Sequence, residues 1–184
     1  QAGVCTATSG PGATNLITGI ATAYMDSIPM VALTGQVATK LIGKDAFQEV
    51  DITGATLPFT KHSYLIKDGL DIPRVVNEAF HIANTGRPGP VLIDFPMDLL
   101  KKEFDYPDED EDVNIRGYKL MGKANESQVK KVAEAIKGAK KPVILAGGGV
   151  VISDATNEFR KFVKETDIPV VSTMMGIGIL PSDN

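Results

Sequence analysis

The chain has 184 residues, of which 43% are hydrophobic and 23% are charged, and its formal net charge at pH 7 is −4. This composition excludes global disorder, and the negative charge excludes the basic surface by which proteins bind nucleic acids. No apolar run reaches the roughly 20 residues that span a bilayer, and one cysteine cannot form an internal disulfide. No leader-peptide pattern is present, so we expect a cytoplasmic protein, and the absence of an initiator Met suggests a piece of a longer one.

The first half of the sequence alternates short apolar segments with segments of helical periodicity. The expected strands are residues 3–8, 29–34, 62–66 and 91–95, the first, second and fourth of them buried. The expected helices are residues 13–25, 45–54 and 73–84. Pro73 suits the first turn of its helix because that position needs no backbone N–H. This alternation predicts an α/β fold with parallel sheets and helices on both faces.

The alternation is interrupted by residues 103–124. Six of the eight residues 105–112 are acidic, so we predict an exposed acidic linker here. Residues 1–102 and 125–184 are then two separate units. The second of them is too short to be a complete doubly wound domain, and we expect it to be the opening part of one.

The second unit repeats the alternation on a smaller scale. One helix is expected after Ser127 and another after Ser153 or Asp154, because these side chains cap helix N-termini. The expected strands are residues 142–146 and 169–173. Three glycines, residues 147–149, follow the first strand and would let a flat or anionic group approach the backbone. A plain loop is the alternative.

The turn of residues 9–12 (Ser-Gly-Pro-Gly) lies between a strand and a helix. Ligands of open α/β sheets bind at the carboxyl ends of strands, and helix N-termini attract anions. The turn is not a nucleotide fingerprint, because neither G-x-G-x-x-G nor G-x-x-x-x-G-K-[ST] occurs. The alternative is a turn that merely requires the positive φ of glycine.

Three other positions could carry chemistry. Residues 45–49 (Asp-Ala-Phe-Gln-Glu) combine an aromatic ring, an amide and two acids, which suits a pocket, although the exposed start of a helix is the alternative. Lys61 or His62 could transfer protons, but catalysis requires a positioned partner, so a structural role is the alternative. Arg87 suits phosphate or carboxylate recognition, or else complements a helix C-terminus. Cys5 is expected to be buried and inert.

Taken together, these segments resemble the thiamine-diphosphate-dependent decarboxylases and carboligases. The first matching segments are residues 8–15 (TSGPGATN), 26–29 (DSIP) and 34–37 (TGQV). Residues 43–51 (GKDAFQEVD) and 60–62 (TKH) narrow the resemblance to the catalytic large subunit of the acetolactate synthase (acetohydroxyacid synthase) family. Residues 86–91 (GRPGPV) and 141–149 (KPVILAGGG) agree, so the resemblance covers the whole chain in order.

The resemblance implies that residues 1–102 are the later part of a pyrimidine-binding domain and residues 125–184 the start of a Rossmann-like, FAD-associated central domain. The implied enzyme decarboxylates pyruvate and joins the hydroxyethyl unit to pyruvate or 2-oxobutyrate, giving 2-acetolactate or 2-aceto-2-hydroxybutyrate for branched-chain amino-acid biosynthesis. Its cofactors are thiamine diphosphate, Mg²⁺ and a structural FAD. Its implied partners are further copies of itself, as a dimer or tetramer with active sites between subunits, and a small regulatory subunit, with neither nucleic acid nor membrane.

Residue roles follow from the same resemblance. Gln48 and Phe47 match a glutamine and an aromatic residue beside the thiamine cofactor and the acceptor, and Lys61 matches a lysine of the substrate channel. The cofactor-binding residues are Gln48, Ser9, Gly10, Gly12, Asn15, Ser27, Arg87, Gly148, Thr173 and Met174, the last five of them near FAD. We expect Gln48, Lys61 and the turn of residues 9–12 to share one hollow.

Two departures from the family pattern concern channel ligands: Ala38 stands where a proline is frequent, and Met97 where a lysine is frequent. The family's activating glutamate would precede Gln1 and its Mg²⁺ motif would follow Asn184, so we expect no metal ligand and no activity in these 184 residues alone. The alternatives are another carboligase such as glyoxylate carboligase, a non-enzymatic flavin- or nucleotide-binding module, and a stable proteolytic core.

Overall fold

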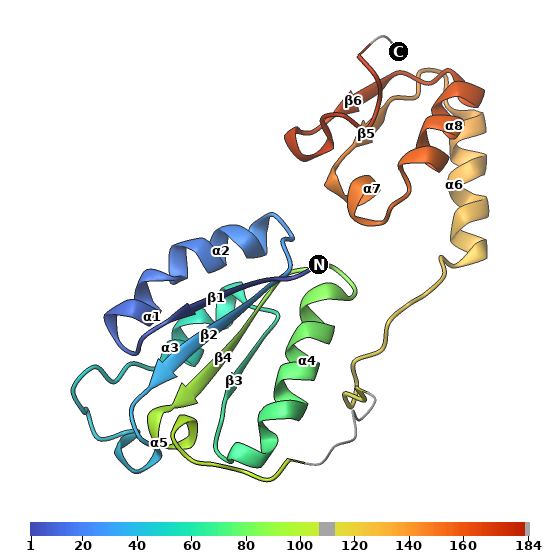
Figure 1. Cartoon of the computed structure of the whole chain (residues 1–184). Helices are drawn as coiled ribbons and strands as arrows, with labels where there is room; N and C mark the ends of the chain where they lie inside the picture. Colours follow the sequence, from blue (N-terminus) through green and yellow to red (C-terminus); the bar gives the residue numbers. More distant parts are fainter. Residues whose placement is uncertain (107–112, 183–184) are drawn as a thin grey trace. The chain divides into compact units, whose positions relative to one another are not determined.

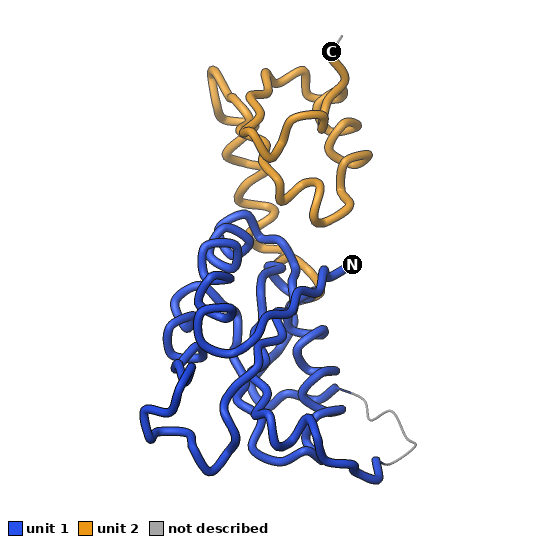
Figure 2. The backbone as a smooth tube through the Cα atoms, turned by 60° about the vertical axis from the view of Figure 1, so that its left-hand side comes forward, with its two compact units in different colours: residues 1–121 blue, residues 122–184 orange. Residues whose placement is uncertain are grey.

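The computed structural model describes residues 1–106 and 113–182, so most of the predicted acidic run, residues 107–112, lies outside the described part. The chain forms two compact units, Gln1–Met121 and Gly122–Asn184 (Figure 2). Residues 113–121 of the predicted linker belong to the first unit. No helix of the described ranges is both long and apolar enough to cross a membrane.

The first unit is built around a parallel four-stranded sheet with the order β1-β2-β4-β3 (Figure 1). Its elements are β1 (Gly3–Ala7), α1 (Pro11–Asn15), α2 (Ile17–Met25), β2 (Met30–Gln36), α3 (Ile52–Thr56), β3 (His62–Leu65), α4 (Ile72–Asn84), β4 (Pro90–Pro96) and α5 (Met97–Leu100), with 3-10 turns at Thr39–Leu41, Leu57–Phe59 and Gly69–Asp71. The predicted α/β class is confirmed, as are the four strands. The helix expected over 13–25 is present as α1 and α2, which meet at Leu16.

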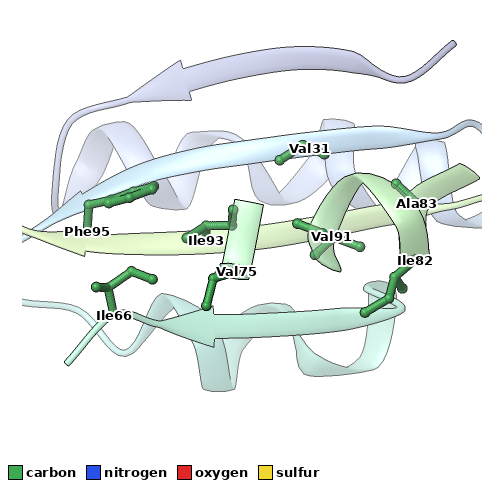
Figure 3. Close-up of a cluster of buried hydrophobic side chains, with 9 residues drawn as sticks. Val31, Ile66, Val75, Ile82, Ala83, Val91, Ile93 and Phe95 are labelled. Carbon is green, nitrogen blue, oxygen red and sulfur yellow. The ribbon is translucent and has the colours of Figure 1, made fainter. Parts of the chain in front are cut away.

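Helices cover both faces of this sheet, as predicted (Figure 1). Side chains of a strand alternate between the two faces, so neighbouring residues enter different cores. Val31 of β2 and Val91 of β4 belong to the core that α4 closes, whereas Ala32 and Leu92 belong to the core closed by α1, α2 and α3. The first of these cores is shown in Figure 3. All seven residues of β4 are buried because the strand lies between two others and under helices on both sides.

Strand β1 corrects one prediction. The apolar residues 3–8 were expected to form a buried strand, but β1 pairs only with β2 among the described residues. Val4 is therefore 56% exposed, and Cys5 is half-buried. Burial nevertheless raises the pKa of the Cys5 thiol, which keeps it protonated and unreactive. A run of apolar residues indicates a strand but does not distinguish the centre of a sheet from its edge.

The helix expected over 45–54 is also wrong. Gly43, Asp45 and Gln48 all have positive φ values, of 78°, 53° and 61°, which no right-handed helix contains. The helix starts later, as α3, where the Asp51 carboxylate accepts a hydrogen bond from the Gly54 N–H at 2.8 Å. An aspartate that caps a helix ends the loop before it, which explains the displaced start.

The second unit carries a parallel two-stranded sheet. Its elements are α6 (Glu126–Gly138), β5 (Ile144–Ala146), α7 (Gly148–Ile152), α8 (Thr156–Thr166) and β6 (Val170–Ser172), with a 3-10 turn at Met174–Gly176. The predicted caps are wrong. Asn125, not Ser127, caps α6 by accepting from two backbone N–H groups, and Ser153 donates its hydroxyl to the Gly149 carbonyl at 2.7 Å. Asp154, with φ of 55°, forms the bend before α8.

Candidate functional site

The turn of residues 9–12 and Gln48 meet at the carboxyl end of the first sheet. Gly10 has φ of 62° and ψ of −120°, a conformation that other residues avoid. A Cβ atom added to Gly10 would lie 2.9 Å from both the Cβ and the carbonyl oxygen of Gln48. A Cβ on Gly35, at the end of β2, would lie 3.3 Å from the Ser9 nitrogen. Glycines therefore let the backbones of three segments come together here.

The loop that carries Gln48 is closed by its own glutamate. The Glu49 carboxylate accepts hydrogen bonds from the backbone N–H groups of Gly43 and Ala46, the latter at 2.9 Å. These bonds, the one from Gly43 first, lower the pKa of Glu49. A carboxylate that is stabilised in its charged form keeps the loop closed at neutral pH.

Gln48 and Phe47 point outward from this closed loop. Both residues are exposed, and the Phe47 side chain is 89% accessible to solvent. Within the described residues, no hydrogen bond holds the Gln48 amide, although the backbone around it is fixed by the contact with Gly10. An aromatic ring and a free amide beside a glycine turn are groups that could hold a heteroaromatic ligand. Asn15, at the end of α1, is also exposed.

A buried polar cluster under this edge escaped the sequence analysis. Asp94 of β4 is 1% exposed, and its two carboxylate oxygens accept from the Thr34 hydroxyl at 2.7 Å and from Gln36 Nε2 at 2.9 Å. Gln36 is 6% exposed and also donates Nε2 to the Val50 carbonyl at 2.8 Å. An acid between Ile93 and Phe95 in a fully apolar strand was the signal that could have revealed this cluster.

Burial raises the pKa of Asp94 to about 6. Desolvation is the main cause, because the charged carboxylate loses its water. The hydrogen bonds from Thr34 and Gln36 act in the opposite direction, and the negative charge of Asp51 adds to the rise. The cluster thus contains a carboxyl group that changes its charge near neutral pH.

Ala38 and Met97, the two departures from the family pattern, follow β2 and β4, and their chain neighbours Thr39 and Asp98 are hydrogen-bonded to each other. Ala38 is buried, and the next residue, Thr39, donates its N–H and its hydroxyl to the Asp98 carboxylate at 2.9 and 2.6 Å. These two bonds lower the pKa of Asp98, the hydroxyl bond being the larger cause. Met97, which precedes Asp98, is 48% exposed.

Lys61 does not share the surface of the glycine turn, so the expectation of one common hollow is wrong within this chain. Lys61 precedes β3, whose first residue, His62, is aligned through β4 and β2 with Val4 at the amino end of β1. The turn follows the carboxyl end of β1. Because all four strands are parallel, Lys61 and the turn lie at opposite edges of the sheet.

The Lys61 ammonium is held by the end of α4. It donates to the carbonyls of Ile82 and Thr85, the latter at 2.6 Å, and contacts the Tyr118 hydroxyl at 3.3 Å. The Tyr118 ring lies 5.8 Å from the ammonium. Three acceptors match the three donors of a lysine, so the geometry favours the structural alternative at this position.

Replacing Lys61 by methionine is expected to destabilise the first unit by about 2 kcal/mol, because two helix-end carbonyls lose their donor. Urea unfolding of the 184-residue chain measures this. Lys67→Met is the matched control, since Lys67 is exposed and its loss should change the unfolding free energy by less than about 0.5 kcal/mol. Equal effects of the two substitutions would contradict the structural role of Lys61.

Ser27 and Arg87, both expected near FAD, meet at the amino edge of the sheet. Arg87 donates Nε to the Ser27 hydroxyl at 2.7 Å and an Nη to the Met25 carbonyl at 3.1 Å. Ser27 has φ of 59°, so the chain turns sharply after α2. Arg87 is exposed, and its guanidinium has donors left for an anionic group. Both of its proposed roles, helix-end charge and anion recognition, therefore fit the position.

The residues expected near FAD in the second unit also come together. Gly148 begins α7 and is separated from the end of β5 by Gly147 alone, and Thr173 follows β6. A Cβ on Gly148 would lie 3.1 Å from the Cβ of Met175, and one on Gly147 would lie 3.3 Å from the Thr173 hydroxyl. Met174 is 82% exposed beside them. The carboxyl ends of both strands thus form one small, glycine-lined surface.

Among the residues that the structure describes, no three His, Cys, Asp or Glu side chains are grouped so that they could hold a metal ion.

A cavity of about 280 Å³ lies at the amino edge of the first sheet, lined by residues that include Lys61, Tyr118 and Arg116. Tyr118 and Ile115 thus pack on the first unit, although the sequence predicted a linker there.

Comparison with known sequence families identifies both units. Residues 1–55 match the family described as thiamine pyrophosphate enzyme, N-terminal TPP binding domain. Residues 129–184 match the family described as thiamine pyrophosphate enzyme, central domain. The two matches lie in separate units and in the order that the sequence analysis expected.

Curated relatives match the whole chain. It is 51% identical over 186 residues to an acetolactate synthase of Mycobacterium leprae, with 100% of this chain and 29% of that protein covered. It is 53% identical over 187 residues to a probable acetolactate synthase large subunit of Methanocaldococcus jannaschii, with 100% and 32% covered. For the acetolactate synthase large subunit of Corynebacterium glutamicum, the identity is 49% over 186 residues, with 100% and 29% covered. The chain thus spans about 30% of the length of these relatives.

Proposed function

The chain belongs to the thiamine pyrophosphate enzymes, and from this we propose that it is part of the catalytic large subunit of an acetolactate synthase. The observation that carries the proposal is an identity of 49% to 53% over the whole chain to proteins of that name from bacteria and an archaeon. In the proposed reaction, pyruvate loses CO₂ and its two-carbon unit is joined to a second pyruvate or to 2-oxobutyrate.

Residues 1–102 are proposed to be the later part of the pyrimidine-binding domain. The chemistry of their carboxyl edge fits thiamine diphosphate, because the exposed Phe47 ring and Gln48 amide beside the Gly10 turn offer stacking and hydrogen bonds. The cofactor, when bound, supplies the carbon nucleophile and the electron sink. Gln48 is proposed to orient the acceptor keto acid through its amide, with Ser9 and Asn15 beside it.

Lys61 receives a different role from the one that the family resemblance implies. The resemblance assigns it to the substrate channel, but its own chain holds it at the opposite edge of the sheet from Gln48. The proposal therefore gives Lys61 a structural role at the end of α4. A homo-oligomer, as the family resemblance implies, is part of the proposal, together with a cytoplasmic location and a small regulatory subunit.

The residues proposed for FAD form two sets, each within its own unit: Ser27 and Arg87 in the first, and Gly148, Thr173 and Met174 in the second. In the first set, the observation in favour is the hydrogen bond of 2.7 Å between the two residues; in the second, it is that the residues follow two neighbouring strand ends. A guanidinium suits the diphosphate of such a cofactor. Mg²⁺ is proposed to be bound by parts of the enzyme other than these 184 residues.

The test is the reaction of the full-length protein with pyruvate in the presence of thiamine diphosphate and Mg²⁺. We expect acetolactate, detected as acetoin after acid treatment, and the mixed product when 2-oxobutyrate is added. The purified 184-residue chain should form neither under the same conditions. A full-length protein that condenses only glyoxylate would refute the proposal, as would acetolactate formation by the 184-residue chain alone.

A further inference from the structure

Gln36 links the loop that carries Gln48 to the sheet. Its Nε2 donates to the Val50 carbonyl at 2.8 Å, and its Oε1 accepts from the Val37 N–H at 2.8 Å. Val50 is two residues beyond Gln48. The side chain is 6% exposed, and all of its polar atoms are used once the bond to Asp94 is counted. A buried amide with every bond satisfied has one orientation, and so does the group that it holds.

Asp94 and Thr34 fix the orientation of Gln36. The Asp94 carboxylate accepts from Gln36 Nε2 at 2.9 Å and from the Thr34 hydroxyl at 2.7 Å. Thr34 and Asp94 are paired neighbours on β2 and β4, the two central strands of the sheet. The loop is therefore connected, through two side chains, to the most deeply buried part of the fold.

The Asp51 carboxylate joins the end of the loop to α3 through the Gly54 N–H, whereas Gln36 joins the loop directly to the sheet. The bonds that Glu49 accepts come from Gly43 and Ala46, so they close the loop on itself without attaching it to the sheet. The apolar side chain of Val50 packs against the second core, which is a contact without a fixed direction. The Gly10 turn packs on Gln48 itself, while the bond from Gln36 attaches the loop to the sheet two residues beyond it.

We propose that Gln36, braced by Asp94, is a positioning residue that sets the place of the Gln48 amide beside the glycine turn and thereby the choice between the two acceptor keto acids. This inference rests on the proposed function, since it needs an acceptor at Gln48. It adds a role for two buried side chains that touch neither substrate nor cofactor.

The first test needs no cofactor. In the 184-residue chain, Gln36→Met removes the bond to Val50 while keeping the side-chain length. Hydrogen exchange of the backbone amides of residues 43–52 should become at least tenfold faster. Thr60→Val is the matched control, because it removes a buried hydroxyl that bonds the Thr56 carbonyl at 3.1 Å, away from the loop. It should leave exchange in residues 43–52 unchanged, and unchanged exchange in Gln36→Met would overturn the proposal.

The second test uses the full-length protein supplied with pyruvate and 2-oxobutyrate together. The ratio of the two products does not depend on how much of a variant is folded. Gln36→Met should change this ratio at least threefold, and Thr60→Val should not change it. In a Gln48→Ala background, the same Gln36 substitution should change the ratio no further, because the effect passes through Gln48. Independent effects of the two substitutions would show a merely structural role and overturn the proposal.

Should Gln36→Met not fold, Asp94→Ser replaces it in both tests. Serine is too short to hold Gln36, so exchange in residues 43–52 and the product ratio should move in the directions given above, and their constancy would contradict the proposal. A wild-type protein that forms neither product would refute the proposed function, whereas the exchange experiment would still decide whether Gln36 holds the loop.

Discussion

The substitution Gly10→Ala is expected to destabilise the first unit by about 3 kcal/mol, because the backbone conformation is closed to alanine and the new methyl group has no space. Its Cβ would lie 2.9 Å from the Gln48 carbonyl oxygen and 3.0 Å from the Gln48 Cα, which are backbone atoms and cannot rotate away. The loop around Gln48 must therefore move. In the full-length protein, the proposed activity should fall at least a hundredfold.

Urea unfolding followed by tyrosine fluorescence measures this change in the 184-residue chain. The chain has no tryptophan, and all four of its tyrosines lie in the first unit, so the signal reports that unit alone. Gly19→Ala is the matched control: Gly19 lies in α2, and a Cβ there has no atom within 4 Å. This control should stabilise the unit by about 0.5–1 kcal/mol through helix propensity. A Gly10→Ala variant as stable as wild type would contradict the contact with Gln48.

The first unit is expected to lose about 3 kcal/mol of unfolding free energy between pH 4 and pH 7 on account of Asp94. The pKa of Asp94 is raised from 3.8 to about 6 in the folded chain, so the folded state holds a proton that the unfolded chain releases. The contribution is complete below pH 4. It is lost as the pH rises through 6 and stays lost above that, because the buried carboxylate is then charged.

Asp94→Asn isolates this contribution. The asparagine oxygen can accept from Gln36, and its NH₂ group can donate to the Thr34 hydroxyl, so the cluster remains paired at every pH. The unfolding free energies of wild type and variant, measured in urea at pH 4, 5.5 and 7, should therefore diverge by about 3 kcal/mol in favour of the variant on going from pH 4 to pH 7. Glu49 and Asp98, whose pKa values are lowered, act in the opposite direction in both proteins and cancel in the comparison. A constant difference would contradict the burial of a charged Asp94.

The predictions that failed share a cause. Periodicity locates Cys5 in a strand, but whether that strand has one neighbour or two depends on pairing with residues far along the chain. Residues 45–54 contain helix-compatible side chains, yet Glu49 and Asp51 bond backbone N–H groups instead, which competes with helix formation. Asn125 rather than Ser127 caps α6, and the sequence did not distinguish them because both are good cap residues within one helical turn.

The amino-acid sequence by itself determined the α/β class, the parallel strands and the family, since these depend on local periodicity and on short motifs read in order. Through the family resemblance it also placed Ser27, Arg87, Gly148, Thr173 and Met174 in one expected set, within which the structure shows a hydrogen bond between Ser27 and Arg87. Only the tertiary structure decided that Lys61 lies at the other edge of the sheet and that Asp94 and Gln36 meet in the interior. The contact between Gln36 and Asp94 joins residues 58 positions apart, and both results follow from the register of paired strands, for which no short stretch of sequence carries a signal.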